Sequence, residues 1–366
     1  MVSEVQTTGA RKLTAEVIVV GGGLIGLAVS AALAERGVEV TLVGEHRPGE
    51  ASPAAAGMLA PSVERAPGPA HQFGIAARDR YPSYVEFLAE RTGVKIPLNR
   101  LGILQVAFNE KGIKGLKKSA LPTSRWLDAK ELQHFEPALP HALGAMFNAQ
   151  DGAVDNVVLL EALNKFCSTN KWIERFEGAV KSVKPGDKSC TVSMTSGEER
   201  NAPRVVLAAG AWTGKISGAR LAKSVRPARG QLVSYSSTPL RHVAYGPSGY
   251  VVPRGNATIA GSTMEDVGFD PTTTEAGIKK VRAAAEEICP VLASSTTQAW
   301  AGLRPGTSDR LPIIGTRSDL SGLIFATGHF RNGVLLSLIT GRIVAAIVAQ
   351  EPPPLDIAAF SPERFA

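Results

Sequence analysis

Sulfur chemistry is the first class of function that the sequence restricts. Only three cysteines occur, Cys167, Cys190 and Cys289, and they stand far apart. An odd number of distant cysteines gives neither a disulfide framework nor a CxxC pair. We therefore expect buried or half-buried thiols in a reducing compartment. The six histidines lack the spacing of metal ligands, so no metal site is predicted.

Long hydrophobic segments are also missing from the sequence. The longest apolar run falls well short of the ~20 residues that cross a bilayer, so no transmembrane helix is expected. The first twelve residues are polar and lack the apolar core of a signal peptide. These absences favour a cytoplasmic protein with no membrane partner.

Positive charge exceeds negative charge, with a formal net charge of +7. Such an excess suits an anionic ligand or a nucleic acid. The densest basic cluster has the spacing of a solvated helix face and consists of Lys111, Lys114, Lys117 and Lys118. No aromatic-basic module accompanies it, so we predict no nucleic-acid partner.

The overall composition indicates a globular chain of more than one domain. Hydrophobic residues make up 44% of the 366 residues and charged residues 20%, which excludes disorder as the main state. A chain of this length favours about two domains.

The N-terminal part of the sequence predicts one βαβ unit. Residues 16–20 are apolar and β-branched, as in a buried strand, and a glycine turn follows at 21–26. Residues 24–36 predict a helix that ends at Gly37, and 39–43 predict a second strand. The Pro-, Ala- and Gly-rich segment 46–70 predicts a long irregular loop, which is usually functional.

Further elements follow the same patterns along the chain. Helices are expected at 75–92, 159–171, 274–289 and 333–350. Strands are expected at 101–108, 204–208 and 323–327, with alternating short strands across 225–261.

The strands suited to a parallel sheet occur early, in the middle and late in the chain. We therefore predict a mixed α/β fold: a discontinuous Rossmann-like nucleotide-binding domain with an inserted antiparallel-sheet substrate domain. The nucleotide-binding domain is assigned residues 15–75, 145–215 and 297–350. The substrate domain is assigned 76–144 and 216–296, and the terminal extensions are 1–14 and 351–366.

The glycine turn fits the GxGxxG pattern of dinucleotide binding. Gly21 permits the tight turn, Gly23 lets the backbone approach a pyrophosphate, and Gly26 lets helix and strand pack closely. The alternative is a glycine-rich turn without a ligand. The acid that binds the ribose is expected about 20 residues on, where Gly44 stands and Glu45 follows. Glu45 is either this acid or an exposed surface glutamate.

Four segments together show a family resemblance. They are the glycine turn 21–26, SPAAAGML at 52–59, WAGLRPGT at 300–307 and GHFRNG at 328–333. The chain resembles the glycine oxidase branch of the D-amino-acid oxidase family of flavoenzymes over roughly residues 15–350. The resemblance implies non-covalent FAD, a small amino-acid substrate with a free carboxylate, oxygen as a second substrate, and a homo-oligomer.

The resemblance also implies which residues bind the cofactor. Those expected along the adenosine and pyrophosphate are Gly21, Gly23, Leu24, Ile25, Gly26, Gly44, Glu45 and Val180. Those expected along the rest of the cofactor are Ser52, Ala56, Gly57, Met58, Gly210, His329, Phe330, Arg331, Asn332, Gly333, Val334 and Leu335. The alternative for GHFRNG is an ordinary turn between a strand and a helix, without a role in cofactor binding.

Substrate-binding residues are carried over in the same way. Arg304 matches the family's carboxylate-binding arginine, which grips a carboxylate with two parallel hydrogen bonds. Tyr250 matches a tyrosine on the same carboxylate, Arg331 an arginine on the amine side, and Met264 a pocket methionine. The alternatives are a surface arginine at 304, a core tyrosine at 250 and a core methionine at 264.

The chain departs from the family two residues before this tyrosine. Bacillus-type glycine oxidases carry a histidine there, whereas this chain has Ser248, followed by Gly249. Small residues at this place predict a wider pocket mouth and a glycine with a substituent on nitrogen. The alternative is that the loop closes by another path and that glycine is the substrate.

The activity implied by the resemblance is oxidation of glycine or an N-substituted glycine. A hydride passes from the α-carbon to flavin N5, the imine hydrolyses to glyoxylate and ammonia or a primary amine, and O2 becomes H2O2. The alternatives are a D-amino-acid or sarcosine-type dehydrogenase with another electron acceptor, and a non-catalytic flavin-binding protein. An NAD-dependent enzyme is disfavoured by GHFRNG.

Overall fold

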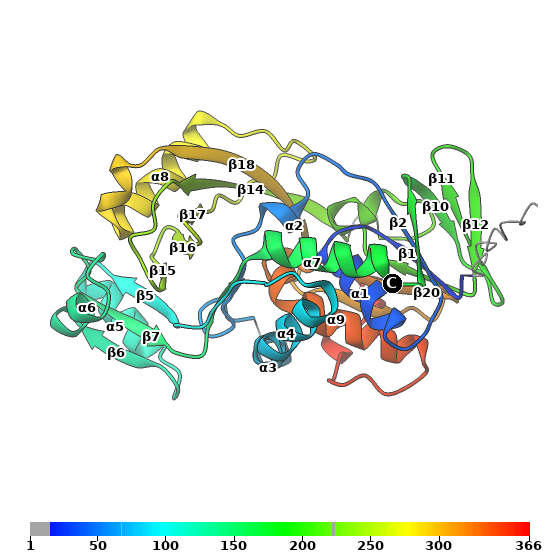
Figure 1. Cartoon of the computed structure of the whole chain (residues 1–366), viewed down its shortest axis with the longest axis horizontal. Coiled ribbons are helices and arrows are strands. Elements are labelled where there is room, and N and C mark those ends of the chain that lie inside the picture. Colours follow the sequence, from blue (N-terminus) through cyan, green and yellow to red (C-terminus); the bar gives the residue numbers. More distant parts are fainter. Residues whose placement is uncertain (1–14, 67, 222–223) are drawn as a thin grey trace, which may run out of the picture.

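Two large sheets and the helices that cover them make up most of the molecule (Figure 1). The computed structural model describes residues 15–66, 68–221 and 224–366. The predicted N-terminal extension 1–14 lies outside the described residues. Along the long axis, the sheet that contains β1 and β2 lies toward one end, and strands β5 to β7 lie toward the other.

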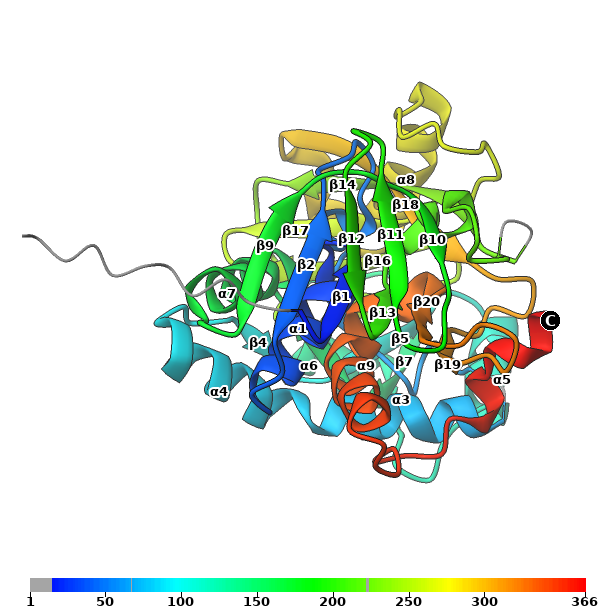
Figure 2. The same cartoon turned by 90° about the vertical axis from the view of Figure 1, so that its right-hand side faces the viewer.

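The first sheet is assembled from distant parts of the chain. Its strand order is β19-β20-β13-β1-β2-β9, and all neighbours are parallel except β19 and β20 (Figure 2). The strands are β1 Val17–Val20, β2 Val40–Gly44, β9 Ile173–Glu177, β13 Arg204–Leu207, β19 Ile313–Thr316 and β20 Leu323–Thr327. The prediction of a discontinuous Rossmann-like fold is confirmed.

Both faces of this sheet are covered, which explains why β1 is apolar throughout. Val17 and Val19 pack against helices, and Ile18 and Val20 pack against a small second sheet. The helices are α1 Leu24–Ala34, α3 Pro69–Asp79, α4 Tyr81–Thr92, α7 Asn156–Thr169 and α9 Gly333–Val348. The small sheet consists of β10 Val180–Lys184, β11 Cys190–Met194 and β12 Glu199–Ala202.

Helix α9 crosses α1 at very close range. A Cβ atom on Gly341 would lie 2.5 Å from the carbonyl oxygen of Ala28, so only glycine permits this approach. Within the described residues, Phe330–Val348 is the one helical segment long and apolar enough to cross a membrane, and 67% of it is buried. Packing against α1 in the core accounts for its apolar character.

The third sheet is mostly antiparallel and has the order β18-β14-β17-β16-β15-β5-β7-β6. Only β15 and β5 pair in parallel. Its strands are β5 Ile103–Ala107, β6 Arg125–Asp128, β7 Gly144–Asn148, β14 Arg226–Tyr235, β15 Val243–Tyr245, β16 Tyr250–Arg254, β17 Ala257–Gly261 and β18 Thr297–Gly306. Helix α8 Glu275–Ile288 packs on it, and α5 Glu110–Lys118 and α6 Ala129–Phe135 lie beside β6 and β7 (Figure 1).

The segment 46–70 is not irregular throughout. It contains the short helix α2 Ala51–Ala54 and the strand β3 Met58–Leu59, which pairs with β8 Gly152–Val154. Strand β4 Leu98–Asn99 completes this three-stranded sheet.

The expected single helix at 75–92 was wrong, because two helices meet at Arg80. Pro82 lies in the first turn of α4, where its missing N–H is tolerated, whereas inside a continuous helix it would remove a hydrogen bond.

Other local expectations are confirmed by burial. Cys167, Cys190 and Cys289 are buried free thiols. The four clustered lysines lie on the exposed face of α5. The segment 351–366, predicted as an extension, packs back on the fold: Phe360 is buried, and its ring centroid lies 4.6 Å from that of Phe73.

Candidate active site

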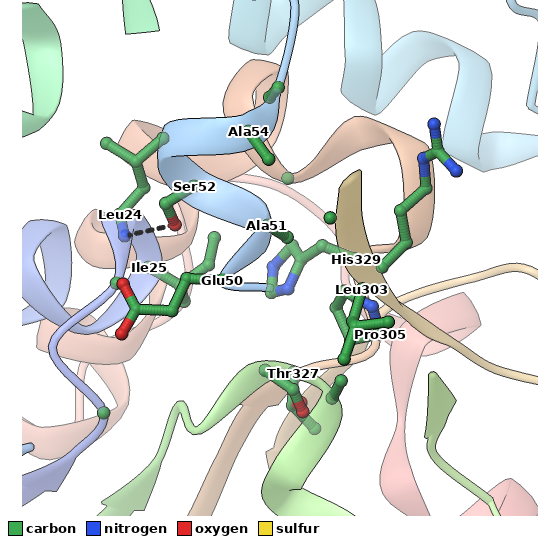
Figure 3. A pocket seen from close by; sticks show the side chains of 18 of the residues that line it. Leu24, Ile25, Glu50, Ala51, Ser52, Ala54, Leu303, Pro305, Thr327 and His329 are labelled. Atoms are coloured by element: carbon green, nitrogen blue, oxygen red, sulfur yellow. Dashed lines mark hydrogen bonds between the residues drawn. The ribbon is translucent and has the colours of Figure 1, made fainter. Parts of the chain in front are cut away.

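A long cavity runs from the glycine turn after β1 to strands β14 and β18 (Figure 3). In Figure 3, Leu24 and Ser52 lie at one side of this cavity and Leu303 and Pro305 at the other, with the His329 ring between them. Of the predicted cofactor-binding residues, the following line it: Gly21, Gly23, Leu24, Ile25, Gly44, Glu45, Ser52, Ala56, Gly57, Met58, Val180, Gly210, His329, Phe330, Arg331, Asn332, Gly333 and Val334. Of the predicted substrate-binding residues, Tyr250, Arg304 and Arg331 line it.

The glycine turn brings the backbone to the cavity wall. Gly21 has φ +122°, and a Cβ atom there would lie 2.3 Å from the carbonyl oxygen of Ala208. Gly26 packs beneath the turn instead of lining the cavity, since its Cβ would lie 1.8 Å from the oxygen of Gly21. Helix α1 starts here without a side-chain cap at Gly23, and its first N–H groups and dipole favour an anion.

The segment around α2 closes over this helix terminus. The hydroxyl oxygen of Ser52 accepts a hydrogen bond of 3.0 Å from the backbone N–H of Leu24, as the dashed line in Figure 3 shows. Ser52 thus links the predicted pyrophosphate end of the cavity to the loop 46–70.

Charged and aromatic side chains gather where β2 ends. Strand β2 ends at Gly44, and Glu45 follows at the cavity, where it forms an ion pair with Arg47. The guanidinium of Arg47 lies 5.6 Å from the ring centroid of Trp212. Arg47 and Trp212 also line the cavity, and the sequence did not single them out.

His329 presents an unpaired nitrogen at the middle of the cavity. The side chain is 2% exposed, and its Nε2 lies 3.0 Å from the hydroxyl of Thr340. Its Nδ1 is buried and has no hydrogen-bond partner among the described residues. Burial lowers the pKa of His329 to about 3, so the imidazole is neutral.

Helix α9 starts beside this histidine and also lacks a side-chain cap. Val334 lines the cavity, whereas Leu335 points into the core behind it. A buried polar atom without a partner lies at the same cavity as the N-termini of α1 and α9. The Leu24 N–H of α1 donates to Ser52, and α9 has no side-chain cap. Such a lining fits a polar, anionic, elongated ligand. A flavin dinucleotide has this character, so the residues present fit the implied cofactor.

Arg304 lies at the far end of the cavity, on β18. Its guanidinium lies directly over Gly230 of β14: a Cβ atom there would come within 2.0 Å of Nη1. Arg304 donates to the hydroxyl of Ser262 at 2.8 Å and to the carbonyl of Thr263 at 3.3 Å. Burial lowers the pKa of Arg304, and Tyr250 partly offsets this effect. An arginine remains charged in such a setting, so it presents a half-buried cation to an anionic ligand.

A second polar cluster adjoins Arg304 and consists of Arg331, Glu64 and Tyr245. Arg331 forms an ion pair with Glu64 and donates to the hydroxyl of Tyr245 at 3.1 Å. Burial alone would lower the pKa of Arg331, but Glu64 and Tyr245 together raise it. Burial, followed by the charge of Glu64, raises the pKa of Tyr245. Tyr245 stacks on Tyr250 with ring centroids 6.0 Å apart.

Two of the predicted substrate-binding residues, Met264 and Ser248, do not line the cavity. Met264 is 50% exposed because the backbone turns Thr263, not its neighbour, toward the interior. Ser248 is exposed in the turn between β15 and β16, where the N–H of Gly246 donates to the oxygen of Gly249. A Cβ atom on Gly249 would lie 2.8 Å from the oxygen of Gly261, so close packing accounts for this small residue.

Glu64 and Tyr245 were missed from the sequence. Tyr245 pairs across the hairpin with Tyr250, which places both side chains on one face of the sheet. The five-residue spacing of two tyrosines around a glycine turn was a usable signal. Glu64 had no comparable local signal beyond its place in the long loop.

Comparisons with known proteins agree with this cavity. The family model described as "FAD dependent oxidoreductase" (DAO) matches residues 16–347. The bifunctional protein ThiO/ThiG of Synechocystis sp. is 33% identical over 96% of this chain and 54% of its own length, so the chain spans about half of that relative. The glycine oxidase of Geobacillus kaustophilus is 33% identical over 95% of this chain and 97% of its own.

Structure comparison gives the same result. The crystal structure of glycine oxidase from G. kaustophilus matches with a TM-score of 0.87 and 31% identity, covering 94% of this chain and 97% of that one. The resemblance stated from the sequence motifs is therefore confirmed. The chain belongs to the DAO family of FAD-dependent oxidoreductases.

Proposed function

We propose that this protein is an FAD-dependent oxidase of glycine or an N-substituted glycine. The observation that carries the proposal is the half-buried guanidinium of Arg304, which lies beside Tyr250 in the same cavity as the glycine turn. A half-buried guanidinium beside a hydroxyl donor suits a small carboxylate. The similarity to glycine oxidases supports this choice of substrate.

Each end of the cavity has a distinct role in this proposal. The N-terminus of α1 binds the pyrophosphate, with Gly21 and Gly23 allowing close backbone approach. His329 and the N-terminus of α9 lie beside the isoalloxazine, where neutral Nδ1 offers one polar contact. Bound FAD supplies the two-electron acceptor.

Arg304 and Tyr250 fix the substrate by its carboxylate. Two parallel hydrogen bonds from one planar guanidinium restrict rotation, and the Tyr250 hydroxyl adds a third donor. Ser262 and Thr263 accept hydrogen bonds from Arg304, so its orientation is set before the substrate arrives. Loss of hydride from the α-carbon and hydrolysis of the imine yield glyoxylate and ammonia or a primary amine. Reduction of O2 by the same two electrons yields H2O2.

The proposal is tested by the products. Glycine and N-methylglycine are incubated with the FAD-loaded protein, and glyoxylate, oxygen uptake and H2O2 are measured together. Equal amounts of the three are expected. Glyoxylate formed only with an added dye, without oxygen uptake, would identify a dehydrogenase instead. The absence of glyoxylate with every glycine derivative would refute the proposed activity.

A further inference from the structure

Glu64 lies at the same end of the cavity as Arg304. The other glutamates that line it, Glu45 and Glu50, lie near Arg47 at the end of β2. Glu64 also influences the pKa of Arg304, along with Tyr250 and Arg331. Its side chain is 14% exposed. A carboxylate this close to the predicted carboxylate-binding arginine has no role in gripping an anion.

One oxygen of Glu64 remains available. Its Oε1 accepts hydrogen bonds from Arg331 and Tyr245. Across the described ranges, Oε2 makes no hydrogen bond and no ion pair. A carboxylate offers about four lone-pair sites, so Oε2 can accept from a further donor in the cavity.

At this end of the cavity, the substrate's amine needs a hydrogen-bond acceptor, because the neighbouring Arg304 and Arg331 are cations. An amino acid arrives as a zwitterion, with its ammonium one carbon away from the carboxylate that Arg304 would bind. Arg331, placed on the amine side by the resemblance, has five donors and no acceptor, so it repels an ammonium. Glu64 neutralises Arg331 and leaves Arg304 free to pair with the carboxylate.

The loop that carries Glu64 is anchored by buried polar groups. The backbone N–H and the hydroxyl of Ser62 both donate to Asp151 at 2.9 Å, and Arg78 donates to Asp151 at 2.8 Å. Ser62, Asp151 and Arg78 are 6%, 0% and 5% exposed. The N–H of Glu64 then donates to the oxygen of Ala60, which closes the turn. This anchoring fixes the position of the carboxylate before a ligand binds.

We propose that Glu64 binds the amine of the substrate, accepting a hydrogen bond through Oε2, and thereby selects carboxylates that carry an amine. The inference rests on the proposed function and names a specificity-determining residue of the same site. It also allows one substituent on nitrogen, because Oε2 needs only one N–H from the amine.

The test compares two ligands of similar size, glycine and acetate, on FAD-loaded Glu64→Gln. Binding of acetate is read from the change in flavin absorbance, and binding of glycine from the saturation of anaerobic flavin reduction. Glycine should bind about 10–100-fold more weakly than to the unchanged protein, the range of one charge-assisted hydrogen bond. Acetate should bind equally well or more tightly, because a negative charge near its own has been removed.

Two further variants complete the experiment. Glu161→Gln removes an exposed carboxylate on α7 and should leave both affinities unchanged. Glu64→Asp keeps the charge but shortens the side chain. It should weaken the binding of glycine by an intermediate factor and leave the binding of acetate unchanged. This variant also serves if Glu64→Gln fails to retain FAD.

The outcomes separate this inference from the proposed function. If Glu64→Gln binds glycine and acetate equally more weakly, or binds glycine as tightly as before, while the original protein is active, the role of Glu64 is overturned and the proposed function is not. If no glycine derivative reduces the flavin of the protein without substitutions, the proposed function is overturned. As a second readout, the apparent pKa of flavin reduction should fall in Glu64→Gln, because the bound ammonium loses its partner. A purely structural role would leave that pKa in place.

Discussion

Replacing Arg304 with alanine should remove most turnover while the flavin stays bound. The side chain contacts Ser262 and Thr263 at the end of the cavity, far from the glycine turn that would hold the pyrophosphate. Removing a half-buried cation also relieves its partial desolvation, so the fold should tolerate the change. The expected defect is therefore in substrate binding and not in FAD content.

The size of the defect follows from the fork geometry. One hydrogen bond to a charged group contributes about 1.5–3 kcal/mol. Loss of a two-bond grip should cost about 3 kcal/mol or more, which corresponds to roughly 100-fold or more in kcat/KM. Arg304→Lys should recover only part of this, because one ammonium cannot form two parallel bonds to a carboxylate.

Steady-state kinetics with glycine or the best N-substituted glycine measures this change, and flavin absorbance measures FAD content. Arg125→Ala is a suitable control, since Arg125 is exposed and pairs with the exposed Glu131. Unchanged kcat/KM in Arg304→Ala would remove Arg304 from the substrate site. Full recovery in Arg304→Lys would show that the charge matters and that the fork geometry does not.

Three further predictions concern the cofactor and the fold. Gly21→Ala should abolish FAD retention, because its Cβ would lie 2.3 Å from the oxygen of Ala208; a full ratio of flavin to protein absorbance would contradict this. Acid precipitation should release FAD into the supernatant, whereas yellow colour in the pellet would indicate a covalent link. The buried carboxylate of Glu136 accepts hydrogen bonds from the backbone N–H of Arg241 and from the backbone N–H and ring of His242. Glu136→Gln should therefore lower the free energy of unfolding by about 3 kcal/mol, measured by urea titration at pH 7. Burial raises the pKa of Glu136, but these hydrogen bonds outweigh it and lower the pKa. The stabilisation is thus complete above the ordinary glutamate pKa of about 4.3 and is lost as the pH falls below it, and a difference that grows in acid would refute this.

The predictable part of the fold is the part set by local pattern. The strand expected at 16–20, the glycine turn and the helix after it depend on residues within one βαβ unit. The structure has them nearly as expected, as β1, the turn and α1. Helix α9, expected at 333–350, also forms nearly as expected, at Gly333–Val348. The break between α3 and α4 was missed because the apolar spacing continues through Pro82, although the backbone does not.

The candidate site was predictable only where a motif is contiguous in sequence. GHFRNG and the segment around Arg304 line the cavity together. Glu64 was not predicted as a site residue, because its partner Arg331 is 267 positions away in the sequence. Asp151, which anchors the loop of Glu64, is 89 positions from Ser62. Ser248, expected at the pocket mouth, is exposed in the hairpin turn between β15 and β16 and does not line the cavity.

The most direct measurement of the central claim is anaerobic reduction of the bound flavin. The FAD-loaded protein is mixed in a stopped-flow instrument with glycine, N-methylglycine or a longer N-alkylglycine, without oxygen. At least one of these should bleach the flavin absorbance with a rate that saturates in substrate and that Arg304→Ala lowers. A flavin that remains oxidised with all three, in a protein that binds FAD fully, would contradict the account.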